Sequence, residues 1–297
     1  SHLITIEQLL NHHSGIANFT NQDDYKSYME RPHTKQEMLD IFNKLGSDFA
    51  PNSEYQYSNT NYVLLTFILE DITKHTYAEE LLKRVCAKAI LGDTHVGGKI
   101  NTANNEAQSY SYENDAWTAE TETDLSVPQG AGNIVSTAKD LCLFMEALFH
   151  GKLISMPMLE KMKTLKDGYG YGMLRFPFGK KWFYGHTGGI DGFQSMLGYN
   201  EEDKVAFCSL GNGYNYPMNR VAIATLSAVY DLPYEIPSFS SKANISDIDS
   251  KTKEGVYHSD KLDMKITISK KNDTLMAQAT NQAAFPLEKV SDWECKF

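Results

Sequence analysis

The chain contains 297 residues, of which 41% are hydrophobic and 22% charged, a composition typical of globular proteins and sufficient for one large domain or two smaller ones. Its formal net charge of -10 argues against a nucleic-acid partner, because phosphate binding requires clustered lysine and arginine side chains. No apolar run reaches the ~18 residues that a membrane-spanning helix needs, so we predict no transmembrane segment.

The cysteines show none of the spacings that bind zinc, and we interpret them as packed free thiols. They are Cys86, Cys142, Cys208 and Cys295. We predict no metal site and no cofactor. The chain begins at Ser1 without a methionine, in the approach to a helix, so we expect the first residues of the natural protein to precede it. Any targeting segment would lie among those residues.

A short helix is predicted to begin after Thr5 and to lead into two adjacent histidines, His12 and His13. A metal-binding pair is one interpretation. However, neighbouring helical residues face different ways, and no acidic or cysteine residue stands at ligand spacing. We favour a structural role for His12, as a hydrogen-bonded side chain that closes the turn. A second helix is predicted from Thr34 to Leu45.

Tyr57 and Asn59 stand at a predicted junction between a loop and a buried helix. Residues Pro51 to Ser53 are turn formers, and apolar side chains recur at spacings of three and four from Asn59 to Lys74. A Tyr-x-Asn triplet at such a junction can place a phenol and an amide side by side at the mouth of a cleft. Alone, it could equally consist of a packed tyrosine and a helix-capping asparagine. A further helix is predicted from Tyr77 to Ile90.

Two Ser-x-x-Lys patterns occur, and we interpret neither as a nucleophile with its lysine base. Ser136, ahead of Lys139, stands where the N-cap of an amphipathic helix is expected. The second pattern begins at Ser250 and lies in a polar stretch without apolar support. Residues 93–130 are predicted to be irregular, and long excursions of this kind often line binding sites.

The later part of the chain predicts β structure. Strands are expected around Trp182–Tyr184, Gly192–Tyr199 and Val205–Leu210, with a helix from Met218 to Tyr230. Three antiparallel strands with helices before and after predict an α+β domain over residues 1–232, an antiparallel sheet flanked by helices plus a helical region. Residues 233–254 predict a linker. From residue 255 to 297, alternating apolar and polar residues predict part of a separate small β domain, which we expect to continue beyond Phe297.

His186, Thr187, Gly188 and Gly189 follow an aromatic strand. Glycines after a strand allow the backbone of a substrate to approach the strand edge. The N–H of Gly189 could face a substrate carbonyl as an oxyanion-hole donor, and His186 could supply positive charge or a proton near a substrate carboxylate. The alternative is a strand-end histidine followed by a glycine turn.

Together, these motifs resemble the serine β-lactamase and penicillin-binding protein superfamily, in the branch of class C β-lactamases, D-alanyl-D-alanine carboxypeptidases and esterases. The resemblance runs from Thr5 to about Tyr230, and its segments occur in the family's order. They are Leu9–Gly15 (L-L-x-H-x-S-G), Tyr57–Asn59 (Y-x-N), Gly130–Asp140 (the G-A-G…S-T-A-x-D-L stretch) and His186–Gly188 (H/K-T-G). The tail from Gly255 resembles the lipocalin-like β domain often appended to such enzymes.

The resemblance implies a hydrolase that transfers an acyl group through a serine ester to water, with a β-lactam, a D-Ala-D-Ala peptide or a small ester as substrate. It implies that Tyr57 moves protons between the nucleophile and the leaving group. A phenol with a pKa of ~10 needs neighbouring positive charge to do this at neutral pH. Asn59 would hydrogen-bond the substrate amide and the family's lysine.

The resemblance also implies how the acid end of the substrate is held. His186 and Thr187, with Gly188 beside them, would bind that end of the substrate. The N–H of Gly189 would join the N–H of the serine nucleophile in stabilising the tetrahedral oxyanion.

We do not find the family's Ser-x-x-Lys motif in the position that the resemblance implies. The family's Ser-x-x-Lys precedes L-L-x-H-x-S-G and would therefore lie before Ser1, so we expect this stretch alone not to turn over substrate. A protein that binds peptidoglycan-like ligands without hydrolysis is the alternative. Within the enzyme interpretation, His186 in place of lysine argues against an efficient penicillinase, because a neutral imidazole attracts a carboxylate less than an ammonium does. The family suggests a periplasmic or secreted location, and no oligomeric state is predicted.

Overall fold

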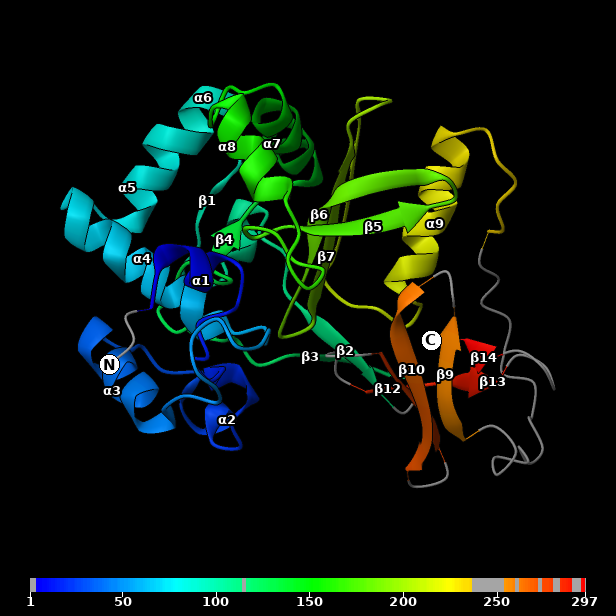
Figure 1. Cartoon of the computed structure of the whole chain (residues 1–297), viewed down its shortest axis with the longest axis horizontal. Coiled ribbons are helices and arrows are strands. Elements are labelled where there is room, and N and C mark those ends of the chain that lie inside the picture. Colours follow the sequence, from blue (N-terminus) through cyan, green and yellow to red (C-terminus); the bar gives the residue numbers. More distant parts are fainter. Residues whose placement is uncertain are drawn as a thin grey trace. The chain divides into compact units, whose positions relative to one another are not determined.

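The structure is a computed structural model that describes residues 4–113, 116–236, 254–259, 262–271, 274–279, 284–289 and 295–296. The chain divides into two compact units, Ser1–Tyr234 and Glu235–Phe297 (Figure 1). The first unit combines an antiparallel sheet with helices, which confirms the predicted α+β class. Most of the predicted linker at 233–254, the Ser-x-x-Lys pattern at Ser250 and most of the predicted turn at 271–273 lie outside the described residues.

The central sheet of the first unit has four antiparallel strands. In spatial order they are β5 (Leu174–Phe178), β6 (Lys181–Ile190), β7 (Phe193–Asn200) and β8 (Val205–Gly211). Short loops join consecutive strands, so neighbours in sequence are neighbours in space. Strand β5 was not predicted from the sequence. It contains Pro177, which is compatible with its position at the edge of the sheet.

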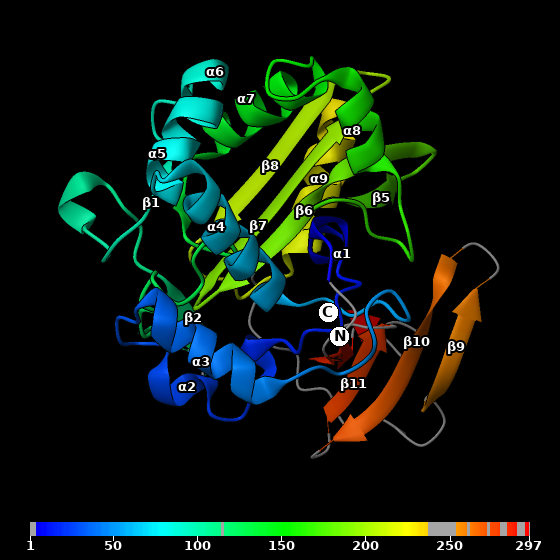
Figure 2. The same ribbon diagram turned by 60° about the vertical axis from the view of Figure 1, so that its left-hand side comes forward.

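Helices cover both faces of this sheet (Figure 2). They are α7 (Ala138–Phe149), α8 (Met156–Lys163) and α9 (Met218–Val229). On one face, Phe183 is fully buried in a cluster with Leu226 of α9. On the other face, Tyr199 stacks on Phe149 of α7, with 4.4 Å between the ring centroids. Side chains alternate across a strand, so His186, three residues from Phe183, lies on the face opposite α9.

A group of helices forms the other part of the first unit. They are α1 (Ile6–Leu10), α2 (Tyr25–Tyr28), α3 (Lys35–Leu45) and α4 (Asn59–Thr73). Phe19, Phe42 and Phe67 belong to one buried apolar cluster in this region. Thr5 and Thr34 form capping boxes at the starts of α1 and α3, as predicted.

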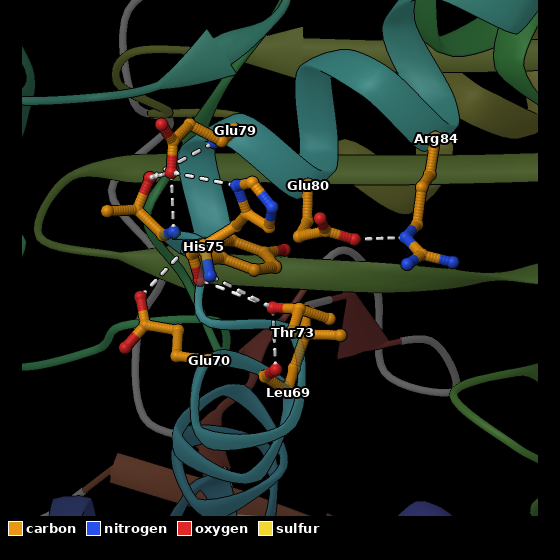
Figure 3. Close-up of polar contacts among 9 residues, drawn as sticks. Leu69, Glu70, Thr73, His75, Glu79, Glu80 and Arg84 are labelled. Carbon is orange, nitrogen blue, oxygen red and sulfur yellow. Dashed lines mark hydrogen bonds and ion pairs between the residues drawn. The ribbon is translucent and has the colours of Figure 1, made fainter.

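The helix predicted from residue 77 to residue 90 contains a local change of pitch. It consists of α5 (Tyr77–Leu81), a π-helical turn η2 (Leu82–Cys86) and α6 (Ala87–Ala89). A capping box of Thr76 and Glu79 fixes its start, and Figure 3 labels Glu79 of this pair. Glu80 is buried and forms an ion pair with Arg84 one turn later. The pair neutralises a buried carboxylate where the wider π turn begins.

Residues 93–130 are less irregular than predicted. The elements in and beside this stretch are β1 (His95–Val96), η3 (Thr102–Asn104), β2 (Tyr110–Glu113), β3 (Ala116–Ala119) and β4 (Ile134–Val135). Strand β1 pairs with β4, and β2 pairs with β3. The prediction was wrong because polar residues dominate the stretch and the strands have at most four residues. Tyr112 and Trp117 contact each other on the exposed β2–β3 ribbon.

The N-cap of α7 is Thr137 rather than the predicted Ser136. The Thr137 hydroxyl accepts the backbone N–H of Asp140 at 3.2 Å, whereas the Ser136 hydroxyl shares a 2.8 Å hydrogen bond with that of Thr94. The hydroxyl of Thr94 also donates to the carboxylate of Asp140. Ser136 is therefore part of a structural network beside the helix start, one residue before the cap.

The second unit contains a sheet with strand order β12-β11-β10-β9 and a separate pair of strands. Its strands are β9 (Gly255–Ser259), β10 (Leu262–Lys271), β11 (Thr274–Ala279), β12 (Phe285–Pro286), β13 (Glu288–Lys289) and β14 (Cys295–Lys296). Strands β10 and β11 form the predicted hairpin, with Ile266 opposite Ala279. Leu275 and Ala277 of β11 are buried and give the sheet an apolar face.

Replacing Phe183 with alanine is expected to lower the free energy of unfolding by about 3–5 kcal/mol, because its ring is fully buried between β6 and α9. The adjacent Trp182 is 47% exposed, so Trp182→Ala is the matched control, with an expected loss below about 1 kcal/mol. Chemical denaturation measures both values. Equal losses would show that the packing of α9 against β6 does not stabilise the unit.

Candidate active site

Strand β6 leaves part of one edge open. Lys181–Gly185 pair with β5, and Tyr184–Ile190 pair with β7. From His186 to Ile190, no described strand occupies the edge opposite β7. The His-Thr-Gly-Gly segment therefore lies within the strand. The prediction that it follows the strand was wrong, because the β6–β7 pairing continues to the hairpin turn.

The hairpin between β6 and β7 determines which backbone groups face the open edge. A two-residue loop, Asp191–Gly192, closes on the hydrogen-bonded pair Ile190 and Phe193. Hydrogen-bonded and non-hydrogen-bonded pairs alternate along an antiparallel ladder. The N–H and C=O groups of Thr187 and Gly189 are therefore directed away from β7, toward the open edge.

The two glycines of this segment have different surroundings. A Cβ atom at Gly188 would lie 2.4 Å from the hydroxyl oxygen of Ser195 on β7. A Cβ atom at Gly189 would have the carbonyl oxygen of Phe193 as its nearest neighbour, at 3.9 Å. A side chain at 188 would therefore displace the Ser195 hydroxyl, whereas one at 189 would meet no close neighbour.

The tip of the hairpin is held by Asp191. Its carboxylate accepts the backbone N–H of Thr123 at 3.0 Å and the Thr123 hydroxyl at 2.6 Å. Thr123 is 1% exposed, so these bonds are shielded from water. They join the hairpin to the loop that follows β3 and hold the open edge of β6 in place.

Tyr57 and His186 are brought together. Their ring centroids are 6.1 Å apart, although one ring comes from the loop before α4 and the other from β6. Burial raises the pKa of Tyr57, and no charged or hydrogen-bonded neighbour among the described residues offsets it. The phenol is therefore protonated at neutral pH in this chain.

Both ring nitrogens of His186 are bound by the protein. The Tyr169 hydroxyl donates to Nε2 at 2.9 Å, and Nδ1–H donates to the carbonyl oxygen of Thr187. This network assigns the proton to Nδ1. Burial lowers the pKa of His186, and the bond to Thr187 only partly opposes this. Of the two roles considered from the sequence, positive charge or a proton, burial of the ring disfavours the charged form and agrees with the neutral imidazole used in comparing His186 with lysine.

Tyr169 was not predicted from the sequence. Its side chain is 2% exposed, and its ring lies edge-on to those of His12 at 4.7 Å and His186 at 5.8 Å. The run Gly168–Gly172 alternates glycine with tyrosine, which fixes a turn next to buried aromatic rings. That alternation of glycine and tyrosine was the only local sequence feature that could have indicated a role for Tyr169.

His12 lies fully buried against Tyr57, with 4.2 Å between the ring centroids. Its Nδ1 accepts the backbone N–H of Ser58, the N-cap residue of α4, at 3.1 Å. The bond thus reaches across to α4, whereas the sequence predicted that His12 closes its own turn. Nε2 has no hydrogen-bond partner among the described residues. Burial is the main cause that lowers the pKa of His12 to about 3, so the ring is neutral at pH 7.

Asn59 is held by a different set of contacts. Its side-chain amide donates to the hydroxyl of Thr20 at 3.0 Å, and its backbone N–H donates to the side-chain oxygen of Asn18 at 3.0 Å. Asn59 is the first residue of α4 and is not its N-cap. The structure brings Tyr57 and His186 together, whereas the amide group of Asn59 is bound to the loop at Thr20.

Within the described ranges, no cluster of three or more His, Cys, Asp or Glu residues is arranged to hold a metal ion. His13 is buried and contacts the carboxylate of Asp167 through Nε2 at 2.8 Å. Cys86, Cys142 and Cys208 are free thiols. The described helices are all too short or too polar to span a bilayer.

Comparison with known proteins identifies the family. The model of the family described as Beta-lactamase matches residues 1–231. The chain belongs to the Beta-lactamase family. It is 27% identical over 265 residues to penicillin-binding protein 4* of Bacillus subtilis (strain 168), a match that covers 79% of this chain and 57% of that protein. It is 24% identical over 218 residues to teichoic acid D-alanine hydrolase of Staphylococcus aureus (strain NCTC 8325 / PS 47), covering 71% and 52%.

The chain spans about half the length of these curated relatives. Among solved structures, D-amino acid amidase from Ochrobactrum anthropi SV3, complexed with D-phenylalanine, is 28% identical with a TM-score of 0.67, covering 77% of this chain and 72% of that one. The octameric penicillin-binding protein homologue from Pyrococcus abyssi is 20% identical with a TM-score of 0.67, covering 97% and 70%, a likeness of fold alone. This Beta-lactamase family chain is thus related to serine hydrolases.

The free energy of unfolding is expected to fall in acid because His12 is buried as a neutral ring. An unfolded histidine takes up a proton below pH ~6.5, whereas the folded chain holds the pKa of His12 at about 3. The stability that the neutral ring contributes is complete above pH ~6.5 and is lost as pH falls toward 3, by at most about 1.4 kcal/mol per pH unit. His12→Gln is expected to remove this one-proton dependence from urea unfolding curves measured between about pH 4 and 6.

The control for this measurement is His75→Gln, because the side chain of His75 is 52% exposed. That variant is expected to keep the wild-type dependence of stability on pH. An unchanged dependence in His12→Gln would contradict the assignment of a neutral buried ring.

Proposed function

We propose that the chain supplies the substrate-binding and proton-transfer groups of a serine hydrolase, which cleaves a β-lactam, a D-Ala-D-Ala peptide or a small ester through an acyl-enzyme. The observation that best supports this is the position of Tyr57 and His186 next to the open edge of β6. Thr187 and Gly189 direct backbone groups to that edge. A ligand in extended conformation can bind there through main-chain hydrogen bonds, as in other cases of strand addition.

Each group has a distinct role in this proposal. The N–H of Gly189 and that of the serine nucleophile stabilise the oxyanion of the tetrahedral intermediate. Thr187 and Gly188 form the strand on which the substrate lies. Asn59 hydrogen-bonds the substrate amide through its side-chain oxygen, because its amide nitrogen is bound to Thr20.

Tyr57 needs a neighbouring positive charge before it can transfer protons at neutral pH. Burial raises its pKa, and the adjacent rings of His12 and His186 are uncharged. An ammonium group beside the phenol would lower the pKa by stabilising the phenolate. We infer that the lysine of the family's Ser-x-x-Lys motif provides this charge, as the family resemblance implies. We propose that these 297 residues alone do not turn over substrate, because neither of their Ser-x-x-Lys patterns, at Ser136 and at Ser250, is interpreted as the nucleophile.

We also assign the chain to the branch that contains class C β-lactamases, D-Ala-D-Ala carboxypeptidases and esterases, and its second unit to a lipocalin-like domain. The sheet of antiparallel hairpins in that unit supports the second assignment. By the same family resemblance, we propose that the protein is periplasmic or secreted.

A protein that binds such ligands without hydrolysis is the second candidate, and the uncharged surroundings of Tyr57 favour it. Labelling of the full-length protein with a fluorophosphonate or with penicillin separates the two candidates. A covalent adduct supports the hydrolase, and its absence supports the binding protein. Parallel assays with nitrocefin and p-nitrophenyl acetate distinguish a β-lactamase from an esterase.

Tyr57→Phe in the full-length protein is expected to lower kcat by about 10²–10⁴-fold, because it removes the proton-transfer group and keeps the ring. Circular dichroism is expected to show an intact fold. Tyr55→Phe is the matched control, since Tyr55 also packs beside His12 but has no proposed role in the reaction, and it should retain kcat within about tenfold. A wild-type kcat in Tyr57→Phe would refute the assigned role.

A further inference from the structure

We propose that Tyr169 and His186 form an uncharged, hydrogen-bonded pair that determines the substrate class of this site. The pair favours substrates in which the group beside the scissile bond is a neutral ester or amide. Substrates with a free carboxylate at that position are disfavoured. The inference rests on the proposed function and names the substrate class of that site. It narrows the substrates considered above and identifies Tyr169 as a positioning residue that acts through His186.

The first argument is that His186 has no free nitrogen for a substrate. Its Nε2 accepts the Tyr169 hydroxyl at 2.9 Å, and its Nδ1–H donates to the carbonyl oxygen of Thr187. A carboxylate is an acceptor and needs a donor. To provide one, His186 would have to give up its bond to Thr187 or take up a second proton. A proton on Nε2 would reverse the bond to Tyr169, whose buried hydroxyl would then have to donate elsewhere, to the hydroxyl of Tyr62 that it also contacts.

The second argument is that Tyr169 cannot easily move away. Its ring is buried and packs against three other rings, which belong to His12, Tyr55 and Tyr57. These contacts come from the segments after α1 and before α4, so Tyr169 is held from two sides. The orientation of the His186 ring is therefore set by the fold before a substrate arrives.

The third argument concerns charge. The groups that face His186 are Tyr57, Tyr169, His12 and the Thr187 carbonyl, and none of them carries a charge at neutral pH. Burial lowers the pKa of His186, which further disfavours its protonated form. These described groups thus supply no positive charge that would compensate a carboxylate for its lost water, and the ammonium group that we infer beside Tyr57 is assigned to the phenol.

Three basic side chains close in the sequence to His186 or Tyr169 are bound elsewhere. Arg175 lies over the ring of Trp182, 4.4 Å from its centroid, on the part of the sheet away from the open edge. Lys181 pairs with Asp203, and Lys166 donates to the side chain of Asn52 at 2.6 Å. These described cations already have partners, so none of them provides an alternative carboxylate site without losing a contact.

An ester or amide has different requirements. Its carbonyl oxygen needs a hydrogen-bond donor but no counter-charge, and the outward N–H group of Thr187 provides one beside the Gly189 N–H that serves the scissile carbonyl. A neutral substrate end also loses less hydration than a carboxylate when it enters the site. The open edge can therefore bind the ester or amide with the groups it has.

The test compares two ligands that differ only in charge: N-acetyl-D-alanyl-D-alanine and its C-terminal amide. Equilibrium titration of the 297-residue chain at pH 7 is expected to show about tenfold or tighter binding of the amide. His186→Lys is expected to reverse this preference, because it places an ammonium group at the edge. Ala228→Lys is the matched control, since it adds the same charge at the exposed end of α9, on the other face of the sheet, and should keep the preference.

Equal or tighter binding of the carboxylate by the wild-type chain would overturn the inference and leave the proposed function intact. An effect of His186→Lys no larger than that of Ala228→Lys would also overturn it. If the chain binds neither ligand, both the inference and the proposed function fail.

A second measurement tests the positioning role of Tyr169. Nitrogen-15 NMR of the wild-type chain is expected to report His186 as the neutral tautomer with its proton on Nδ1. In Tyr169→Phe, Nε2 loses its donor, so His186 is expected to protonate at a higher pH than in the wild type, and carboxylate binding should strengthen as the pH falls. Unchanged nitrogen shifts at His186 in Tyr169→Phe would refute the pairing, even if the variant is less stable.

Discussion

The hydrogen bond from the backbone N–H of Ser58 to the buried Nδ1 of His12 is one of several that join the segment after α1 to the start of α4. It satisfies one of the unpaired N–H groups at the start of α4 and places the imidazole under the Tyr57 ring. Tyr169 then packs edge-on to the same imidazole and reaches His186 with its hydroxyl. Three segments distant in sequence are thus held together by one buried ring.

The site built on this bond has polar groups but no charge of its own. Its members are phenols, imidazoles and backbone amides, and burial disfavours the ionised form of each side chain. In such an environment the electrostatic interactions of any added charge are stronger, because the local dielectric constant is low. An ammonium group beside Tyr57 would therefore have a much larger effect on the phenol than it would in water.

Local sequence determined some features and not others. The starts of α1 and α3 were predictable because Thr5 and Thr34 each stand three residues before a Gln or Glu, and the capping box needs nothing else. At α7, two neighbouring hydroxyl residues suit the cap equally. Only the contact of Ser136 with Thr94, more than forty positions earlier, leaves the cap to Thr137.

Tyr57 and His186 were connected by the order of family motifs, since nothing in their spacing indicates that the two rings meet. Tyr169 could not be found in this way because its role depends on one tertiary contact, the hydrogen bond to His186. The sequence also left the charge of His186 open between a cationic and a neutral ring, because a pKa depends on burial and on hydrogen-bond partners that sequence does not reveal.

The open edge of β6 also limits the length of what can lie along it. Strand β5 begins opposite Gly185, and the turn at Asp191–Gly192 reverses the chain, so the stretch that no described strand pairs on this side is His186–Ile190. At ~3.4 Å per residue, this is room for about five residues of extended chain. A long strand from another protein would collide with β5 at one end before it could add to the sheet. The edge thus admits short peptide-like molecules while resisting the edge-to-edge association that exposed strands otherwise invite.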